Sequence, residues 1–174
     1  MYYNWELKDD ELFEYDRYAA YEYAKRWAFD RNPDFFDFSG LGGNCTNYAS
    51  QVLYAGGCPM NYERWTGWFY ENPGYRAPAW TGVEFLYDFL IRNKGRGPIA
   101  RECSMEELEI GDIIQLNFGD DDRFDHSPVV VGIEYPINPD NIFIAANSAD
   151  RFDYRLSNYY YTDIRFIHIE GYKL

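Results

Sequence analysis

The sequence predicts an α+β domain, with helices from the N-terminal half packed on an antiparallel sheet from the C-terminal half. Up to about residue 95, apolar residues recur at spacings of three and four, as on one face of a helix. After about residue 105, runs rich in β-branched residues alternate with polar turns. A chain of 174 residues can bury its own core. We therefore expect a single domain over 1–174, helical over about 9–95 and β over about 105–174.

The first helix is expected over residues 9–30. Asp9 or Asp10 is a suitable N-cap, and Asn32 followed by Pro33 ends the helical pattern. The apolar face of this helix consists of residues three or four positions apart, namely Leu12, Tyr15, Tyr18, Ala19, Tyr23 and Trp27.

Two further helices follow. One is expected over 45–55, where the Gly56–Gly57 pair provides a C-terminal stop. The other is expected over 81–91, where Thr81 and Glu84 have the spacing of a capping box. Both segments place their apolar residues on one face, so both should pack against the sheet.

The second half of the chain predicts strands over 112–118, 126–135, 142–148 and 163–172. A charged turn separates the first two strands, and the sequence NPDN at 138–141 makes a turn between the second and the third. Short connections of this kind join antiparallel neighbours, so these segments should form a meander.

The composition excludes several classes of partner. With 29 acidic and 16 basic residues, the formal charge is −13, which disfavours binding to nucleic acid and to anionic membrane surfaces. The N-terminus has no signal-peptide pattern, and no segment is apolar for long enough to span a bilayer. We therefore expect a cytoplasmic protein, or a secreted one if a signal has been removed.

The three cysteines have no spacing typical of disulfides or of zinc sites, which indicates a protein that does not depend on disulfides. The acidic run at 120–122 lacks the glycine and glutamate positions of a calcium-binding loop, so it is expected to be a solvated turn. We expect neither a metal nor another cofactor.

The run SGLGGNCTNYASQVLYAGG, residues 39–57, carries the strongest functional signal. Glycines lead directly into Cys45, which opens a predicted helix. The unpaired N–H groups and the partial positive charge of a helix N-terminus favour a thiolate, the nucleophilic form of cysteine. The alternative is a small buried cysteine without reactivity, the role expected for Cys58 and Cys103, which lack this context.

A base for the cysteine is available in His126, which stands at the start of an apolar strand. A third polar residue must orient the imidazole, and Asn147 is the best candidate because it ends the following strand. The turn between these strands should bring His126 and Asn147 to the same end of a hairpin. A cysteine on a helix start with a later histidine on a strand is the arrangement of papain-like cysteine hydrolases.

Other assignments stay open at this point. His168 is a competing base, although a histidine inside a strand is more often structural. Asp125 and Asp150 are alternative groups for orienting the imidazole. Either would accept a hydrogen bond from the ring nitrogen that does not face the sulfur.

Several segments resemble the putative amidase domain family. Those in the first half are YDRYAAYEYAKRWA, RNPDFFDFSGLGGNCTNYASQVLYAGG and WTGVEFLYDFL; those in the second are GDIIQLNF, HSPVVVGIE, AANSADRFDYRLSNY and RFIHIEGY. The resemblance covers most of the chain in order. It implies a papain-like plan similar to that of NlpC-type peptidases, with Cys45 as nucleophile, His126 as base and Asn147 as the third residue.

Two positions depart from the family's pattern. Members commonly have aspartate where this chain has Asn44, and histidine where it has Asn147. Asparagine can still orient an imidazole. The loss of a carboxylate at Asn44 changes the surroundings of the nucleophile.

The chemistry implied is hydrolysis of an amide, in a peptide or peptidoglycan-like substrate, through a thioester at Cys45. The Cys45 N–H would stabilise the oxyanion together with a second donor, either Asn44 or an upstream tyrosine. The alternatives are a non-catalytic module that binds glycan or peptide, and an acyltransferase that passes the thioester to an amine.

Residues 58–81 lack periodicity and contain Trp65, Trp68 and Trp80. A long loop of this kind has a packing or a functional role, because tryptophans seek burial or a ligand. We expect the stretch from Asn61 to Trp80 to form one wall of a substrate groove, with core packing of the three indoles as the alternative.

Overall fold

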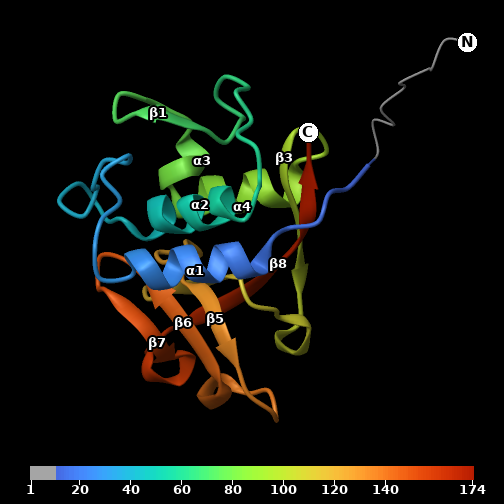
Figure 1. Ribbon diagram of the computed structural model, residues 1–174. Helices are drawn as coiled ribbons and strands as arrows, with labels where there is room; N and C mark the ends of the chain where they lie inside the picture. Colours follow the sequence, from blue (N-terminus) through green and yellow to red (C-terminus); the bar gives the residue numbers. More distant parts are fainter. Residues whose placement is uncertain (1–10) are drawn as a thin grey trace, which may run out of the picture.

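The computed structural model describes residues 11–174 and has the α+β architecture that the sequence predicts. Figure 1 shows the helices gathered on one side of the sheet. The main helices are α1 (Arg17–Trp27), α2 (Cys45–Ala55) and α4 (Val83–Arg92), with the short α3 (Pro78–Thr81) before α4. Helix α2 has the bounds that its flanking glycines predict. In α4, Glu84 accepts from the N–H of Phe124 and pairs with Arg165 instead of closing a capping box with Thr81.

Helix α1 is shorter than expected at its N-terminus. Asp16 caps it by accepting a hydrogen bond from the N–H of Ala19 at 2.9 Å. The preceding residues 11–16 are not helical: Phe13 instead pairs with Tyr172 at the end of the last strand and stacks on its ring at 5.6 Å. The caps expected at Asp9 and Asp10 lie outside the described residues.

The sheet has six strands, all antiparallel, in the order β3-β8-β4-β5-β6-β7. The predicted meander is present for its first three strands, β4, β5 and β6. Its fourth expected strand, β8, does not follow β6 but lies between β3 and β4. Two edge strands, β3 and β7, were not expected from the sequence, because β3 contains a proline and β7 is polar. The bounds are β3 Gly97–Cys103, β4 Ile113–Asn117, β5 Val129–Ile133, β6 Ile142–Ala146, β7 Arg151–Arg155 and β8 Asp163–Lys173; a separate hairpin joins β1 (Tyr70–Asn72) to β2 (Tyr75–Arg76).

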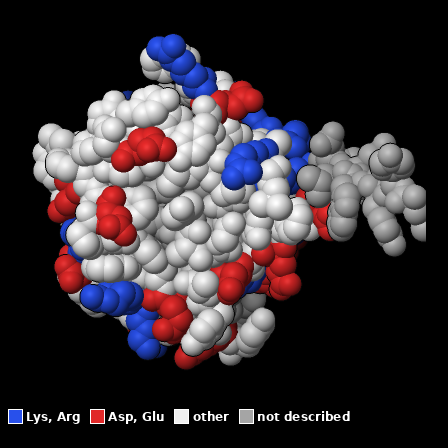
Figure 2. Space-filling model, turned by 45° about the horizontal axis from the view of Figure 1, so that its top comes forward, with Lys and Arg blue, Asp and Glu red and all other residues white. Residues whose placement is uncertain are grey.

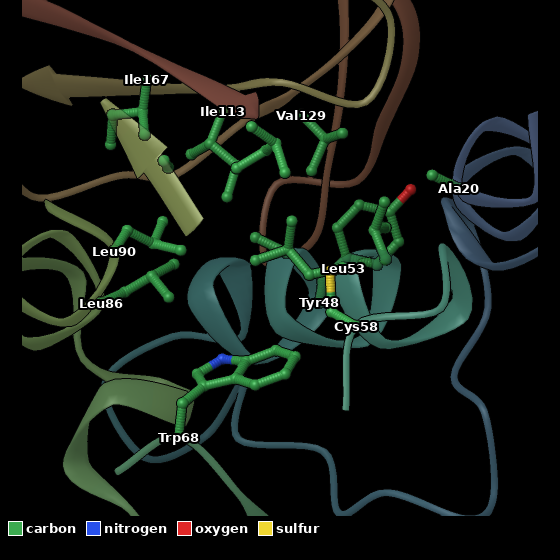
Figure 3. Close-up of a cluster of buried hydrophobic side chains, with 14 of the residues drawn as sticks. Ala20, Tyr48, Leu53, Cys58, Trp68, Leu86, Leu90, Ile113, Val129 and Ile167 are labelled. Atoms are coloured by element: carbon green, nitrogen blue, oxygen red, sulfur yellow. The ribbon is translucent and has the colours of Figure 1, made fainter. Parts of the chain in front are cut away.

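Successive residues of the strands bury their side chains on opposite faces of the sheet. Ile113 packs in the larger cluster between helices and sheet, and Ile114 packs in a second cluster on the other face. Figure 3 shows part of the larger cluster, in which side chains from the helices and the 58–68 segment meet strand residues: Ala20, Tyr48, Leu53, Cys58, Trp68, Leu86, Leu90, Ile113, Val129 and Ile167.

The aromatic segment before α4 is mainly part of this core. Trp68 and Trp80 are fully buried, and their ring centroids lie 4.8 Å apart. The expectation that these two tryptophans line a substrate groove was therefore wrong. Of the three tryptophans in this segment, Trp65 is exposed, at 73%, and lines a cavity of about 1010 Å³ between the 61–67 loop and α4.

The surface charge is mixed on the face seen in Figure 2. Uncharged side chains fill the middle of this face, while acidic and basic side chains gather mainly toward its margins. None of the helices formed by residues 11–174 has the length and apolar character needed to span a bilayer.

Candidate active site

The backbone before α2 adopts conformations that require glycine. Gly42 and Gly43 have φ angles of +103° and +120°, in the region that L side chains rarely adopt. The next N–H, that of Asn44, donates a hydrogen bond to the hydroxyl of Ser148 in the turn after β6. The glycine run thus lets the chain approach this turn immediately before Cys45.

Asn44 fixes the start of α2 through its side chain. Its Oδ1 accepts hydrogen bonds from the N–H of Phe38 at 3.0 Å and from Nδ2 of Asn47 at 2.8 Å. Its Nδ2 donates to Oδ1 of Asn147 at 2.9 Å. The residue is buried. These bonds engage both the oxygen and the nitrogen of the Asn44 amide in holding the loop to the helix. The amide is therefore not directed toward a substrate.

Asn147 belongs to the same polar network. Its Nδ2 donates to the carbonyls of Trp27 at 3.2 Å and Ala28 at 3.0 Å, at the end of α1. The expected hairpin is present, since Val129 pairs with Ala145 and the register brings the start of β5 to the end of β6. The hydrogen bonds of Asn147 nevertheless join α1 to α2, and none goes to the ring of His126.

Cys45 begins α2 with its thiol against the backbone that enters β5. Its Sγ lies 3.8 Å from Oγ1 of Thr46 and 4.0 Å from the carbonyl oxygen of Asp125. The side chain is buried, and burial raises the pKa of the thiol, while the N–H groups of Ser127, Thr46 and Cys45 act in the opposite direction. The carbonyl of Asp125 and the N–H of Ser127 flank residue 126, so Sγ lies against the backbone of His126.

The His126 side chain packs among aromatic rings. Its ring centroid lies 5.9 Å from that of Phe118 and 5.5 Å from that of Tyr159. Its Nε2 lies 3.2 Å from the hydroxyl of Tyr159. Burial lowers the pKa of His126 to about 4, and the nearby Asp125 acts in the opposite direction. The imidazole is therefore neutral at neutral pH.

Tyr159 is a site residue that the sequence analysis missed. It follows the 3₁₀ turn η3 (Leu156–Asn158), within three consecutive tyrosines that have no distinguishing spacing. Burial raises the pKa of Tyr159 to about 12, with Arg151 opposing and Cys45 adding to the rise. Tyr159 therefore keeps its proton and lies within electrostatic reach of Cys45.

His168 is placed elsewhere. Its Nδ1 lies 2.9 Å from Oδ2 of Asp112, just before β4, whereas His126 pairs with Leu116 near the other end of β4. Four residues of strand separate these positions by about 13 Å. His168 therefore does not compete with His126 for the region around Cys45.

The carboxylates considered as orienting groups are also engaged elsewhere. Asp125 accepts a hydrogen bond from the N–H of Phe118 at 2.9 Å, and Asp150 pairs with Arg31 at 2.9 Å. Among residues 11–174, no group of three or more His, Cys, Asp or Glu side chains is placed to hold a metal ion. The site therefore offers a thiol, a neutral imidazole and a phenol hydroxyl, which suffice for nucleophilic and acid–base chemistry.

Comparisons with known proteins identify relatives of this chain. The family model of the putative amidase domain matches residues 14–169. The uncharacterized protein YhbB of Bacillus subtilis (strain 168) is 38% identical over 121 residues, which is 68% of this chain and 38% of that protein. The chain thus matches little more than a third of that relative's length. No solved structure matches the chain.

Proposed function

Because the chain belongs to the putative amidase domain family, we propose that it hydrolyses an amide bond with Cys45 as nucleophile and His126 as the acid–base residue. One observation carries the assignment. Sγ of Cys45, at the N-terminus of α2, lies 4.0 Å from the carbonyl oxygen of Asp125, and the N–H of Ser127 acts to lower the pKa of the thiol; these two backbone groups flank His126. The thiol thus lies beside the backbone of a histidine that follows 81 positions later in the sequence, which supports the assignment.

The protonation states favour proton transfer during the reaction over an ion pair at rest. Burial raises the pKa of the Cys45 thiol and lowers that of His126, so both groups are neutral before substrate binds. The neutral imidazole takes the thiol proton as Sγ attacks the carbonyl carbon. The resulting imidazolium, a strong acid in this setting, gives the proton to the leaving amine.

Water then completes the cycle. His126 removes a proton from a water molecule that attacks the thioester carbonyl, and the same proton returns to Sγ as the carboxylic acid leaves. N–H groups at the start of α2 are suited to stabilise the oxyanion of both steps. Since Sγ lies against the backbone of His126, Nδ1, the ring nitrogen nearer to that backbone, is the atom assigned to take the thiol proton.

The substrate class we propose is a peptide or a peptidoglycan-like amide. Two exposed apolar side chains support an extended acyl segment: Leu41, in the loop that leads to Cys45, and Phe118, whose ring packs on that of His126. In the proposed reaction an amine could replace water as the acceptor of the thioester. The acyltransferase alternative thus differs only in the second step.

The test begins with the three cysteines. Iodoacetamide labelling followed by peptide mass mapping should modify Cys45 faster than Cys58 and Cys103 at neutral pH, because neutral His126 can take the thiol proton as Sγ is alkylated. Cys58 is fully buried, and burial raises the pKa of Cys103 to about 11. Equal or slower labelling of Cys45 would argue against an activated nucleophile.

Activity is then measured on muropeptides from a peptidoglycan digest, with mass spectrometry of the released amine and acid. Cys45→Ala should abolish turnover while Cys103→Ala retains it, and added hydroxylamine should trap a hydroxamate. Full turnover by Cys45→Ala would exclude the proposed nucleophile. Muropeptide binding without turnover in the wild type would identify a non-catalytic binding module.

A further inference from the structure

We propose that Tyr159, and not Asn147, is the residue that positions the His126 ring for proton transfer with Cys45. This inference rests on the proposed function. It assigns to Tyr159 the hydrogen bond that a third catalytic residue normally makes to the ring nitrogen remote from the sulfur. Tyr159 acts through His126, so it is a positioning residue.

Tyr159 is held firmly enough to orient another side chain. The turn η3 before it is anchored by Leu156, which is fully buried, and the N–H of Tyr159 donates to the carbonyl of Leu156 at 3.1 Å. The Tyr159 ring packs edge-on against Tyr154 at 5.3 Å and stacks on Phe118 at 6.1 Å. The hydroxyl is thus fixed by packing on two sides.

The contact is made by one of the two nitrogens of the imidazole. Nε2 lies 3.2 Å from the Tyr159 hydroxyl. When Nε2–H donates to that oxygen, the lone pair of the neutral ring is on Nδ1, the nitrogen nearer to the backbone. That backbone is the one that Sγ of Cys45 touches. In this tautomer, the one that the proposal requires, Nδ1 can accept the thiol proton.

A neutral partner has a different effect from a carboxylate. A carboxylate would stabilise the imidazolium and raise the pKa of the ring. Tyr159 retains its proton, because burial raises its pKa to about 12, so in this tautomer it accepts from Nε2–H without adding a negative charge. The same bond survives when Nδ1 is protonated, since Nε2 donates in both states. His126 is thereby kept a weak base and a strong acid toward the leaving amine.

The other candidates for this position have their hydrogen bonds elsewhere. The amide of Asn147 bonds to Asn44 and to the carbonyls of Trp27 and Ala28. The carboxylate of Asp125 accepts from the N–H of Phe118. Tyr159 alone among these groups contacts the His126 ring.

Nitrogen-15 NMR tests the tautomer without any substrate. The chain has two histidines, so His168→Gln assigns the signals of both. At pH 7.5 the wild-type His126 ring should be protonated at Nε2, and Tyr159→Phe should produce a mixture of tautomers while keeping the aromatic stack. The matched control is Tyr160→Phe, which removes a hydroxyl from a residue that is 96% exposed and should change nothing.

Two NMR outcomes overturn the inference: a wild-type ring protonated at Nδ1, or a Tyr159→Phe ring with unchanged tautomer signals. Both are independent of the fate of Cys45, so a failure of the proposed function would not be mistaken for a failure of this inference.

Kinetics provide the second readout. In Tyr159→Phe the rate of Cys45 alkylation, and kcat on any muropeptide that is turned over, should fall about tenfold, as for loss of one hydrogen bond, with KM unchanged. Tyr160→Phe should match the wild type. If wild-type Cys45 is activated but Tyr159→Phe leaves its rate and pH profile unchanged, the proposed function stands and the positioning role of Tyr159 is excluded.

Discussion

The two histidines lie near opposite ends of β4 and have partners of opposite kinds. His168 faces the carboxylate of Asp112, with Nδ1 2.9 Å from Oδ2. His126 faces the hydroxyl of Tyr159 among aromatic rings. The carboxylate holds His168 in a hydrogen-bonded cluster, whereas the phenol contacts His126, whose imidazole is neutral. The first arrangement suits a structural joint, and the second suits a group that must gain and lose a proton.

The joint around Asp112 connects three distant segments. This fully buried carboxylate accepts hydrogen bonds from Nη1 of Arg17 at 2.8 Å, from the N–H of Ile169 at 3.0 Å and from the N–H of Glu109 at 2.9 Å, in addition to facing His168. Through them α1, the turn before β4 and strand β8 are joined. His168 is one of several partners there, whereas the hydroxyl of Tyr159 is the hydrogen-bond partner of the His126 ring.

The largest effect is expected for Asp112→Ala. Removing the carboxylate leaves the half-buried Arg17 and two backbone N–H groups without their acceptor, which should lower the free energy of unfolding by about 3–5 kcal/mol. Denaturant unfolding followed by circular dichroism measures this. A loss below about 1 kcal/mol would contradict the view that the His168 end is the structural joint.

The pH dependence of stability should report on the protonation of His126. An unfolded histidine binds a proton near pH 6.5, but the folded His126 does so only near its pKa of about 4, because burial opposes its charge. Between these values the unfolded state holds more protons, so stability falls as the pH is lowered. As the pH falls from above 6.5 to below 4, His126 should lower the free energy of unfolding by about 3 kcal/mol in total.

His126→Gln should remove this part of the acid sensitivity, seen as a flatter plot of unfolding free energy against pH between 7 and 4. Carboxylates contribute equally to both curves, so the difference between variant and wild type isolates His126. If His126→Gln keeps the wild-type slope of unfolding free energy against pH, the view that His126 is buried in its neutral form is contradicted. His168→Gln is the control for removing a histidine elsewhere.

An intermediate loss of stability is expected for Asn44→Asp. It tests whether Asn147 belongs to the hydrogen-bond network that joins α1 to α2. Asn44→Asp places a carboxylate oxygen against Oδ1 of Asn147, two acceptors facing each other in a buried site, at a cost of about 1–3 kcal/mol. Adding Asn147→His supplies an N–H donor and should recover much of the loss. A double-mutant cycle without coupling between these positions would contradict the network.

The smallest effect is expected for Glu109→Gln. The carboxylate of Glu109 lies 2.9 Å from Nε of Arg17, but its side chain is 57% exposed, so the pair should contribute less than about 1 kcal/mol. The backbone N–H of Glu109 still reaches Asp112 in this variant. A large loss of unfolding free energy would show that the contacts around Asp112 depend on the exposed side chain of Glu109 rather than on the buried carboxylate of Asp112.

The elements that the sequence predicted well are those whose signals are local. Helix α2 is flanked by glycine pairs, and the central strands are β-branched runs between polar turns. Helix α1 was predicted too long, because the apolar spacing continues through Leu12 and Tyr15 while residues 11–16 are not helical and Phe13 pairs with the end of β8. A contact 159 positions away in the chain leaves no local pattern.

The site shows the same limit. The hairpin of β5 and β6 was predicted with His126 and Asn147 at the same end, but side chains of successive strand residues point to opposite faces. Asn147 points to α1 and α2, whereas His126 packs with Tyr159, which borders the second hydrophobic cluster. Tyr159 reaches His126 only because β7 and η3 return the chain there, and neither element had a sequence signal.

The buried indoles have a practical consequence for following the start of α2 by fluorescence. Nε1 of Trp80 donates to Oδ1 of Asn47 at 2.9 Å, two positions after Cys45, and Nε1 of Trp68 donates to Oγ of Ser50 at 3.0 Å. Indole emission responds to hydrogen bonding and polarity around the ring. Acylation of Cys45 or movement of the α2 N-terminus should therefore shift the emission of two native chromophores, giving a label-free optical signal even before a substrate is known.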